Sequence, residues 1–286
     1  MFLLSGIAEF NIFGATIPLY GPFGILAFLL GMLLCLITAG AFGLRKGDAA
    51  YIYLFGSIGA LLFSKLFYLL VSINRIVADI SAHGFKVLTD VYLTHGMSFY
   101  GGVLGAILGV IITCRIFGLH ASDSFNCLVP AFILSHSVFN IEAFLSGFGF
   151  GNPTHSNFSV IYKSSAYAPN GEQLIPVQLI ESAFELLLAA VLLITALAVT
   201  KKASGRSVIR ATHPGWYTSV QTGNKNGFLV LGLYFLLYGC FRFALGFFRG
   251  DAACIFLMFS VTQWLSIAAV ISGIILILFS HIDNRI

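Results

Sequence analysis

Long apolar runs separated by short polar stretches make up most of this chain. A helix that crosses the hydrocarbon core of a bilayer needs about 20 consecutive, mostly apolar residues. Seven runs reach that length, at residues 19–41, 50–73, 97–118, 125–147, 174–199, 227–249 and 258–280. The pattern therefore predicts an all-α polytopic membrane protein, with a single domain of seven transmembrane helices over residues 1–286 and no soluble domain.

The composition agrees with this prediction. Of the 286 residues, 58% are hydrophobic and 9% are charged, whereas a soluble domain carries about 25% charged residues. The first basic residue is Arg45, so the start of the chain lacks the charged segment of a cleavable signal peptide and we expect it to be the mature start. The five cysteines show neither CxxC nor metal-ligand spacing, their odd number argues against a disulfide framework, and we expect them to be small membrane-core residues.

Basic residues are unevenly divided between the two sets of loops that alternate along the chain. Of the 15 Lys and Arg residues, nine fall on one set and four on the other, while Lys65 and Arg242 lie within predicted spans. Basic loops face the cytoplasm. We therefore expect an outer N-terminus, a cytoplasmic C-terminus, outer loops at about 74–96 and 148–173, and a basic cytoplasmic loop at about 200–226.

Polar residues within the predicted spans crowd toward one side of the membrane. With the orientation above, the outer halves of the spans contain Tyr20, Lys65, Tyr68, Tyr100, Asn140, Glu142, Gln178, Glu181, Glu185, Tyr238, Arg242, Arg249 and Gln263. Ionisable residues in a bilayer are costly and usually face a cavity or a partner. We therefore predict a polar cavity, lined by several helices and open toward the outer leaflet.

Two carboxylates of this set need cations nearby. Glu181 and Glu185 are four residues apart and share one helix face, so they repel each other unless a positive charge faces them. Lys65 and Arg242 are the candidates, and the four residues form either a buried structural ion network or part of a substrate site. Arg242 and Arg249 also share a face, and a guanidinium suits bidentate binding of a phospholipid phosphate. Arg249 fits an interfacial anchor equally well.

Glycines mark two stretches of the outer side. Gly101, Gly105 and Gly109 follow a small-xxx-small pattern, which lets a neighbouring membrane helix approach closely. The stretch SGFGFGNPT at 146–154 ends the fourth span, and we expect it to fold over the cavity entrance.

Seven motifs in this order along the chain resemble one known family. They are LYGPFGILAFLLG at 19–31, GALLFSKLFY at 59–68, GMSFYGGVLG at 96–105, FNIEAFLSGFGFGNPT at 139–154, PVQLIESAFE at 176–185, LYGCFRFALGFFRGD at 237–251 and TQWLS at 262–266. Together they are similar, over nearly the whole chain, to the prolipoprotein diacylglyceryl transferases of bacterial inner membranes. That family also has seven spans and an outer N-terminus.

The resemblance implies an enzyme of the bacterial inner (cytoplasmic) membrane. It would transfer the diacylglyceryl group of phosphatidylglycerol, or of a related phospholipid, to the lipobox cysteine thiol in the signal peptide of a preprolipoprotein. The resemblance implies no metal, no organic cofactor and no nucleic-acid partner. Such chemistry needs positive charge around the leaving phosphate and help in forming a thiolate, because a free cysteine thiol has a pKa of about 8.5.

Site residues follow from the matching motif positions and the polar pattern together. We expect catalytic roles for Tyr100, Arg242 and Tyr238. Substrate-binding roles are expected for Tyr20, Gly21, Lys65, Asn140, Gly147, Gly151, Gln178, Glu181 and Arg249.

The sequence also departs from the family pattern. Tyr100 stands where the family usually has His, Asn140 where it has Arg, and Leu61 where it has a second-span Arg. Ala143, Phe148 and Gly246 replace three further polar residues. His95 and His136 are candidates for a replacement base. These departures leave open a non-catalytic phospholipid- or lipoprotein-binding paralogue, and a transporter is a third alternative, although it predicts polar residues at the membrane midplane.

Overall fold

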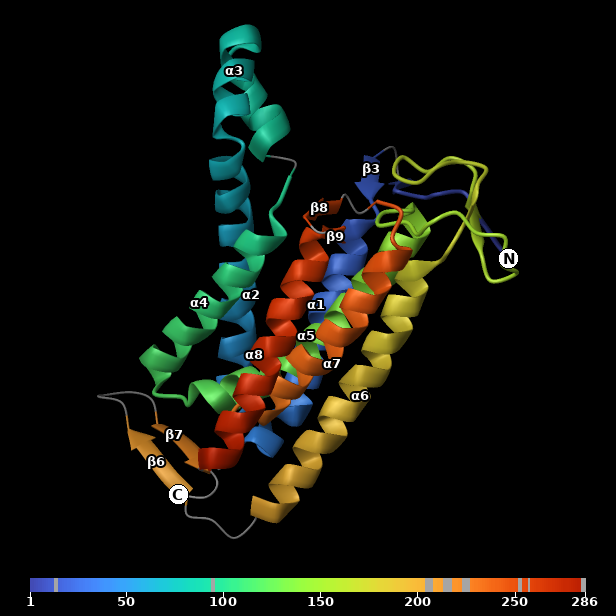
Figure 1. Cartoon of the computed structure of the whole chain (residues 1–286). Helices are drawn as coiled ribbons and strands as arrows, with labels where there is room; N and C mark the ends of the chain where they lie inside the picture. Colours follow the sequence, from blue (N-terminus) through green and yellow to red (C-terminus); the bar gives the residue numbers. More distant parts are fainter. Residues whose placement is uncertain are drawn as a thin grey trace. The chain divides into compact units, whose positions relative to one another are not determined.

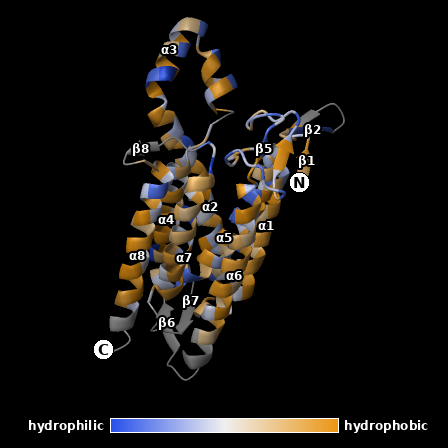
Figure 2. Cartoon of the chain, turned by 45° about the vertical axis from the view of Figure 1, so that its right-hand side comes forward, coloured by the Kyte–Doolittle hydropathy of each residue, from blue (hydrophilic) through white to orange (hydrophobic). Residues whose placement is uncertain are grey.

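The structure is a computed structural model of the chain. It describes all residues except 13–14, 94–95, 204–207, 213–217, 223–226, 252–253, 257 and 284–286. Within the described residues, seven helices are long and apolar enough to cross a membrane. They span Tyr20–Phe42, Lys46–Val71, Phe99–Phe117, Ala121–Ser146, Val177–Ala198, Leu229–Phe248 and Val261–Ser280. The predicted set of seven spans is therefore confirmed, and Figure 2 shows these helices hydrophobic over most of their length.

The chain divides into two compact units. The first contains Met1–Phe42, Asn126–Arg206 and Asn224–Ile286, and the second contains Gly43–Phe125 and Ser207–Gly223. The single domain that we expect from the sequence stays a prediction. Each unit is described by itself below.

The first unit is built from five long helices. They are α1 (Tyr20–Thr38), α5 (Ala121–Ser146, from residue 126 onward), α6 (Val177–Ala203), α7 (Leu229–Leu245) and α8 (Val261–Asp283). Short 3-10 turns extend two of them, η1 (Ala39–Phe42) after α1 and η3 (Gly246–Phe248) after α7.

Helix α7 packs against both α6 and α8 in this unit (Figure 1). Its approach to α8 is close because glycines line the seam. A Cβ on Gly273 would lie 2.6 Å from the backbone nitrogen of Leu236, and one on Gly239 would lie 3.0 Å from the carbonyl oxygen of Ser266. Larger residues at these positions would push the two helices apart.

Short strands fasten the loop between α5 and α6 to the N-terminal segment. Strand β1 (Phe2–Leu4) pairs in parallel with β4 (Val160–Tyr162), and β4 pairs antiparallel with β5 (Gln173–Leu174). A small buried hydrophobic cluster supports this sheet, made of Phe144, Val160, Tyr162, Ala168 and Leu174. The all-α prediction missed this sheet, because strands of two or three residues leave no clear alternation in the sequence.

Two more hairpins lie in the connections of the first unit. Strands β2 (Glu9–Ile12) and β3 (Ala15–Pro18) precede α1, and strands β8 (Cys254–Phe256) and β9 (Phe259–Ser260) precede α8. The N-terminal ends of α1 and α8 are therefore each preceded by a hairpin.

The second unit is centred on α2 (Lys46–Val71) and α4 (Phe99–Phe117). A Cβ on Gly105 would collide with the carbonyl oxygen of Gly59, and Gly101 and Gly109 likewise face backbone carbonyls of α2. Only glycine allows this helix pair to approach so closely, which confirms the packing role predicted for these three glycines.

The prediction of a loop at 74–96 is wrong over part of its length. This segment contains α3 (Ile73–His83) and a π-helical turn, η2 (Leu88–Leu93). Apolar residues at positions 73, 76, 77 and 80 give α3 an amphipathic face, which a search for membrane-length runs does not detect. Helix α3 ends at Gly84, which has a φ of +82°.

The basic loop expected at about 200–226 also contains ordered structure. Helix α6 continues to Ala203, and β6 (Val208–Thr212) pairs antiparallel with β7 (Thr218–Thr222) in the second unit. The rest of this segment, including Arg206 and Lys225, lies outside the described residues.

Candidate functional site

Polar side chains from three helices of the first unit meet at the helix ends nearest the α5–α6 loop. They lie in the second half of α5, the first half of α6 and the second half of α7. We call the set the polar cluster: His136 and Asn140 of α5, Glu181 and Glu185 of α6, and Tyr238 and Arg242 of α7. Each helix supplies two residues four positions apart, so each pair lies on one helix face.

Glu185 is the most buried member of the polar cluster. Its side chain is 0% exposed, and Nδ1 of His136 lies 2.5 Å from its Oε1 atom. The side-chain amide of Asn140 donates to its Oε2 atom at 2.8 Å. Both carboxylate oxygens are therefore engaged, as a carboxylate in an apolar surrounding requires.

Glu181 binds the two residues that α7 contributes to the polar cluster. Its side chain is 2% exposed, Arg242 Nη1 donates to its Oε2 atom at 2.7 Å, and the Tyr238 hydroxyl donates to its Oε1 atom at 2.9 Å. The two neighbouring carboxylates thus have one basic partner each, Arg242 for Glu181 and His136 for Glu185.

This pairing confirms Arg242 as a cation that faces one of the two carboxylates, whereas the contacts described for Lys65 lie within the second unit. The ammonium group of Lys65 donates to the carbonyl oxygens of Tyr92 at 2.9 Å and Gly96 at 3.0 Å, within the second unit. Tyr92 is itself tied to α3, because its hydroxyl donates to Asp79 at 2.5 Å. Lys65 therefore supports the connection between α3 and α4.

Aromatic rings enclose the imidazole of His136. The ring of Phe132, one turn earlier on α5, is nearly parallel to it at a centroid distance of 6.1 Å, and Tyr238 presents its edge at 6.5 Å. Tyr234 stacks on Tyr238 at 5.5 Å. The His136 side chain remains 31% exposed and that of Arg242 17% exposed, so both basic groups are accessible, as is the half-buried Tyr238.

The glycine-rich stretch after α5 is shaped by its close neighbours. Gly149 has a φ of +68°, and a Cβ there would lie 2.8 Å from Nη2 of Arg249. Gly147 has a φ of +87°, and Gly151 faces the carbonyl oxygen of Ile175. The stretch is also joined to the end of α7, where Gly250 donates its backbone N–H to the Phe150 carbonyl at 2.9 Å.

Arg249 lies apart from the polar cluster in its hydrogen bonding. Its Nε and Nη2 atoms donate to the two carboxylate oxygens of Asp251 at 2.9 and 2.7 Å. This bidentate pair uses the guanidinium edge that a phosphate would also need. The choice between an interfacial anchor and a phosphate contact for Arg249 therefore stays a prediction.

Gln178 links α6 to the glycine-rich stretch. Its side chain is 2% exposed, and its amide donates to the carbonyl oxygen of Phe148 at 2.9 Å. Its Oε1 atom is buried without a hydrogen-bond partner in the described part of the chain. Nearby, the Tyr162 hydroxyl donates to the Phe144 carbonyl at 2.7 Å, and burial raises the pKa of Tyr162 to about 12.

The remaining site residues predicted from the sequence do not join these contacts. Tyr20 is 57% exposed at the first turn of α1, and the space beside Gly21 is open. Tyr100 is 46% exposed at the start of α4 in the second unit. His95, one of the two candidate replacement bases, lies outside the described residues.

The polar cluster contains residue types that bind metals, but a positive side chain already lies among them. One ligand atom each from His136, Glu181 and Glu185 lie within 4.8 Å of one another. However, both oxygens of Glu181 already accept hydrogen bonds, one of them from the positive guanidinium of Arg242. That charge opposes a divalent cation at the same place, so the donor set does not fit a metal.

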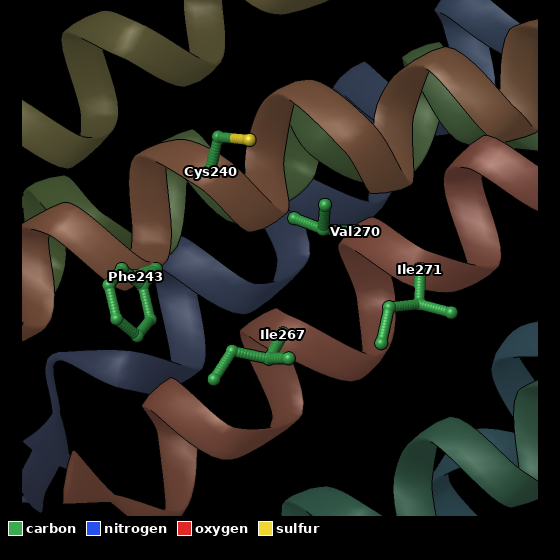
Figure 3. Close-up of a pocket in the computed structure, with 5 residues that line it drawn as sticks. All are labelled: Cys240, Phe243, Ile267, Val270 and Ile271. Carbon is green, nitrogen blue, oxygen red and sulfur yellow. The ribbon is translucent and has the colours of Figure 1, made fainter.

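The polar cavity expected from the sequence stays a prediction. A shallow groove of about 190 Å³ lies between α7 and α8, lined by Cys240, Phe243, Ile267, Val270 and Ile271 (Figure 3). Apart from the thiol of Cys240 its lining is apolar, so it suits hydrocarbon chains and not a headgroup. Cys240 is exposed here on a membrane-length helix, whereas Cys35, Cys114 and Cys127 are buried.

Seven membrane-length helices define a multi-pass membrane protein, and its buried ionisable cluster is the candidate functional site. Comparison with known proteins gives the family. The family model described as prolipoprotein diacylglyceryl transferase matches residues 8–279, and the chain belongs to this family of transferases.

Several relatives align with almost the entire chain. The phosphatidylglycerol--prolipoprotein diacylglyceryl transferase of Clostridium tetani is 28% identical over 265 residues, covering 93% of this chain and 94% of the relative. A protein of Clostridium perfringens with the same name and the number 2 is 24% identical over 277 residues, covering 96% and 95%. One from Rickettsia conorii is 29% identical over 189 residues, covering 65% and 63%.

Proposed function

We propose that this protein transfers the diacylglyceryl group of phosphatidylglycerol to the lipobox cysteine thiol of a preprolipoprotein, forming a thioether. The two clostridial relatives are named for this donor and acceptor, and they align with more than nine tenths of the chain. The observation that carries the proposal is the guanidinium of Arg242, partly exposed and held by Glu181 among membrane helices. No metal or organic cofactor is needed for this reaction.

The reaction is a displacement at carbon. The cysteine sulfur attacks the glyceryl carbon that carries the phosphate, a C–S bond forms, the C–O bond to the phosphate breaks, and glycerol phosphate leaves. Negative charge grows on the leaving phosphate in the transition state. A fixed cation that meets this charge in a region without water lowers the barrier more than the same cation would in water.

Arg242 would supply that cation. One of its nitrogens is bound to Glu181, and a guanidinium has five N–H donors in a rigid fork. The remaining donors can receive phosphate oxygens without breaking the pair. The Tyr238 hydroxyl, bound to the other oxygen of Glu181, would keep this carboxylate in position beside the reacting groups.

The proposal places the polar cluster in the outer half of the bacterial inner membrane, with the N-terminus outside and the C-terminus in the cytoplasm. The excess of Lys and Arg on one set of loops supports this orientation. So does the pairing of β1 with β4, because it joins the N-terminal segment to the loop at the cluster end of α5 and α6. Both substrates would reach the cluster from within the bilayer, and the polar cavity would receive the headgroup.

Other residues are proposed to order the site or to contact the substrates. Asn140 and Gln178 would order the site through Glu185 and the Phe148 carbonyl. Tyr100 would take a polar role near the reacting carbon. Contacts with the substrates remain proposed for Tyr20, Gly21, Lys65, Gly147, Gly151 and Arg249.

A non-catalytic paralogue that binds phospholipid or lipoprotein is the second candidate function. One observation favours it. Asn140, which stands in place of the Arg of the resembling motif, donates to Glu185 and brings no positive charge. A protein that has lost one phosphate-binding cation could keep lipid binding without transfer.

The test uses the purified protein in phospholipid nanodiscs with labelled phosphatidylglycerol and a lipobox peptide. Mass spectrometry of the peptide thiol should detect a diacylglyceryl thioether, and Arg242→Ala should abolish it. Arg115→Ala, at an exposed position near the end of α4, is the matched control and should keep wild-type transfer. Saturable lipid binding without any adduct would support the paralogue, and an unchanged adduct in Arg242→Ala would refute the role of Arg242.

A further inference from the structure

The displacement proposed above also needs a group that removes the thiol proton. A cysteine thiol with a pKa of about 8.5 is mostly protonated near neutral pH. In the polar cluster, Arg242 is permanently protonated, and a tyrosine with a reference pKa of about 10 is a weak acceptor in its neutral form. Histidine is the residue type whose reference pKa of about 6.5 suits this task.

We propose that His136 is the general base of the transfer, positioned by Glu185 and Asn140. The inference rests on the proposed function and adds to it the residue that activates the acceptor thiol. It is carried by the hydrogen bonds, burial and neighbours of the imidazole.

The hydrogen bonding of His136 leaves one ring nitrogen available. Nδ1 is 2.5 Å from Oε1 of Glu185, and Oε2 of Glu185 is held by Asn140 at 2.8 Å. A carboxylate that accepts from Nδ1–H fixes the tautomer in which Nε2 carries the lone pair. Among the described residues, Nε2 has no hydrogen-bond partner. Nε2 is therefore free to accept a proton.

The exposed fraction of the side chain increases from Glu185 through Asn140 to His136. Glu185 is 0% exposed, Asn140 is 9% exposed and the His136 side chain is 31% exposed. The anchor is thus buried and the base is accessible. The nearly parallel ring of Phe132 and the perpendicular ring of Tyr238 flank the imidazole, and the contact of Nδ1 with Glu185 orients it.

The base also lies beside the proposed phosphate contact. Glu181 and Glu185 are one turn apart on α6, and they hold Arg242 from α7 and His136 from α5. A nitrogen of His136 and one oxygen of each carboxylate lie within 4.8 Å of one another. One short stretch of α6 therefore positions both the group that activates the nucleophile and the group that stabilises the leaving phosphate.

With His136 as the base, each proton and electron pair of the reaction is accounted for. Nε2 of His136 takes the proton from the cysteine S–H, and the sulfur lone pair forms the C–S bond. The electrons of the broken C–O bond stay on the phosphate oxygen of glycerol phosphate. The imidazolium then returns its proton to that phosphate, so neither a further reactant nor a redox step is required.

The charged and titratable groups facing His136 are Glu185 and Glu181 from α6, and Tyr238 and Arg242 from α7. All four stay in place in the variant His136→Asn. The asparagine amide can donate to Glu185 from about the position of Nδ1, but it has no atom in place of Nε2. The variant removes the base while it leaves Glu185 paired.

The experiment compares the wild type with His136→Asn in the nanodisc assay, measuring transfer rate, phosphatidylglycerol binding and pH dependence. Loss of a positioned general base should lower kcat by about 10²–10⁴-fold, with lipid binding unchanged. The residual rate of His136→Asn should rise about tenfold per pH unit up to the thiol pKa of about 8.5, whereas the wild-type rate levels off at lower pH. A structural defect would lower the rate equally at every pH.

Two further variants make the outcomes distinct. His155→Asn, at an exposed position of the α5–α6 loop, should behave like the wild type. If the wild type transfers and His136→Asn has an equal rate, the inference alone is overturned. It is also overturned if Tyr100→Phe, and not His136→Asn, changes the pH dependence of the rate. A wild type that forms no thioether would overturn the proposed function and this inference with it.

Discussion

The ion pair between Arg242 and Glu181 should show strong energetic coupling in a double-mutant cycle. The cycle uses Arg242→Gln, Glu181→Gln and the double variant, and it measures whether the pair contributes to stability as a unit. The pair joins α7 to α6, and its side chains are 17% and 2% exposed.

The burial of the two partners sets the expected magnitudes. Exposed ion pairs contribute about 0–1 kcal/mol, and removal of one partner of a buried pair costs about 3–5 kcal/mol. Because the guanidinium is partly exposed, we expect Arg242→Gln to cost about 2–4 kcal/mol. Glu181→Gln should cost about 1–2 kcal/mol, because the amide oxygen can still accept from the Tyr238 hydroxyl. The double variant should cost less than the sum by about 1–2 kcal/mol.

The assay is equilibrium unfolding in mixed micelles with increasing SDS, followed by far-ultraviolet circular dichroism. The pair formed by Arg249 and Asp251 provides the control, because Asp251 is 29% exposed whereas Glu181 is 2% exposed, and because its two residues lie only two positions apart in the chain. The cycle of Arg249→Gln with Asp251→Asn should give a coupling below about 1 kcal/mol. Additive costs for Arg242 and Glu181, within about 0.5 kcal/mol, would refute the argument that Arg242 neutralises Glu181.

Three other predictions concern packing, the loop and the charge balance of the site. Gly105→Ala should lower the SDS midpoint by an amount equivalent to about 1–3 kcal/mol, because its Cβ meets the Gly59 carbonyl; an unchanged midpoint would contradict the packing. Tyr162→Phe should cost about 1 kcal/mol through loss of the hydrogen bond to Phe144. Because the pKa of Tyr162 is raised to about 12 from about 10 in the unfolded chain, wild-type stability should fall as pH rises between these values, and the variant should lack that part of the loss. A strong chelator should leave the transfer rate unchanged, because both oxygens of Glu181 already accept hydrogen bonds and one of them pairs with the guanidinium of Arg242; inactivation that added metal reverses would refute this.

The helices show which parts of the fold a sequence can predict. All seven spans were predictable, because about 20 apolar residues can satisfy their backbone groups in a bilayer only as a helix. Helix α3 was missed because its single apolar face is shorter than a span. The pairing of β1 with β4 was missed because it joins short segments far apart in the chain, and neither has a distinctive pattern of its own.

The polar cluster, too, was predictable only in part from the sequence. The spacing of Glu181 and Glu185 indicated two carboxylates that need positive partners, and Arg242 was identified as one of them. His136 was one of two candidates for a replacement base, and its spacing of four residues from Asn140 places both on one face of α5. The partner that Glu185 receives depends on which face of α5 meets α6, and that contact cannot be derived from either helix alone.

The amino-acid sequence by itself determined the number and approximate limits of the membrane helices, the motifs of the family, and which helices contain ionisable residues. These are properties of single segments, governed by apolar length and helical spacing. Only the tertiary structure decided which carboxylate binds which basic group, that Lys65 donates to backbone carbonyls and that Arg249 pairs with Asp251. Burial allows a charge only where a matching partner lies within hydrogen-bond distance, and that partner is supplied by packing between segments distant in the chain.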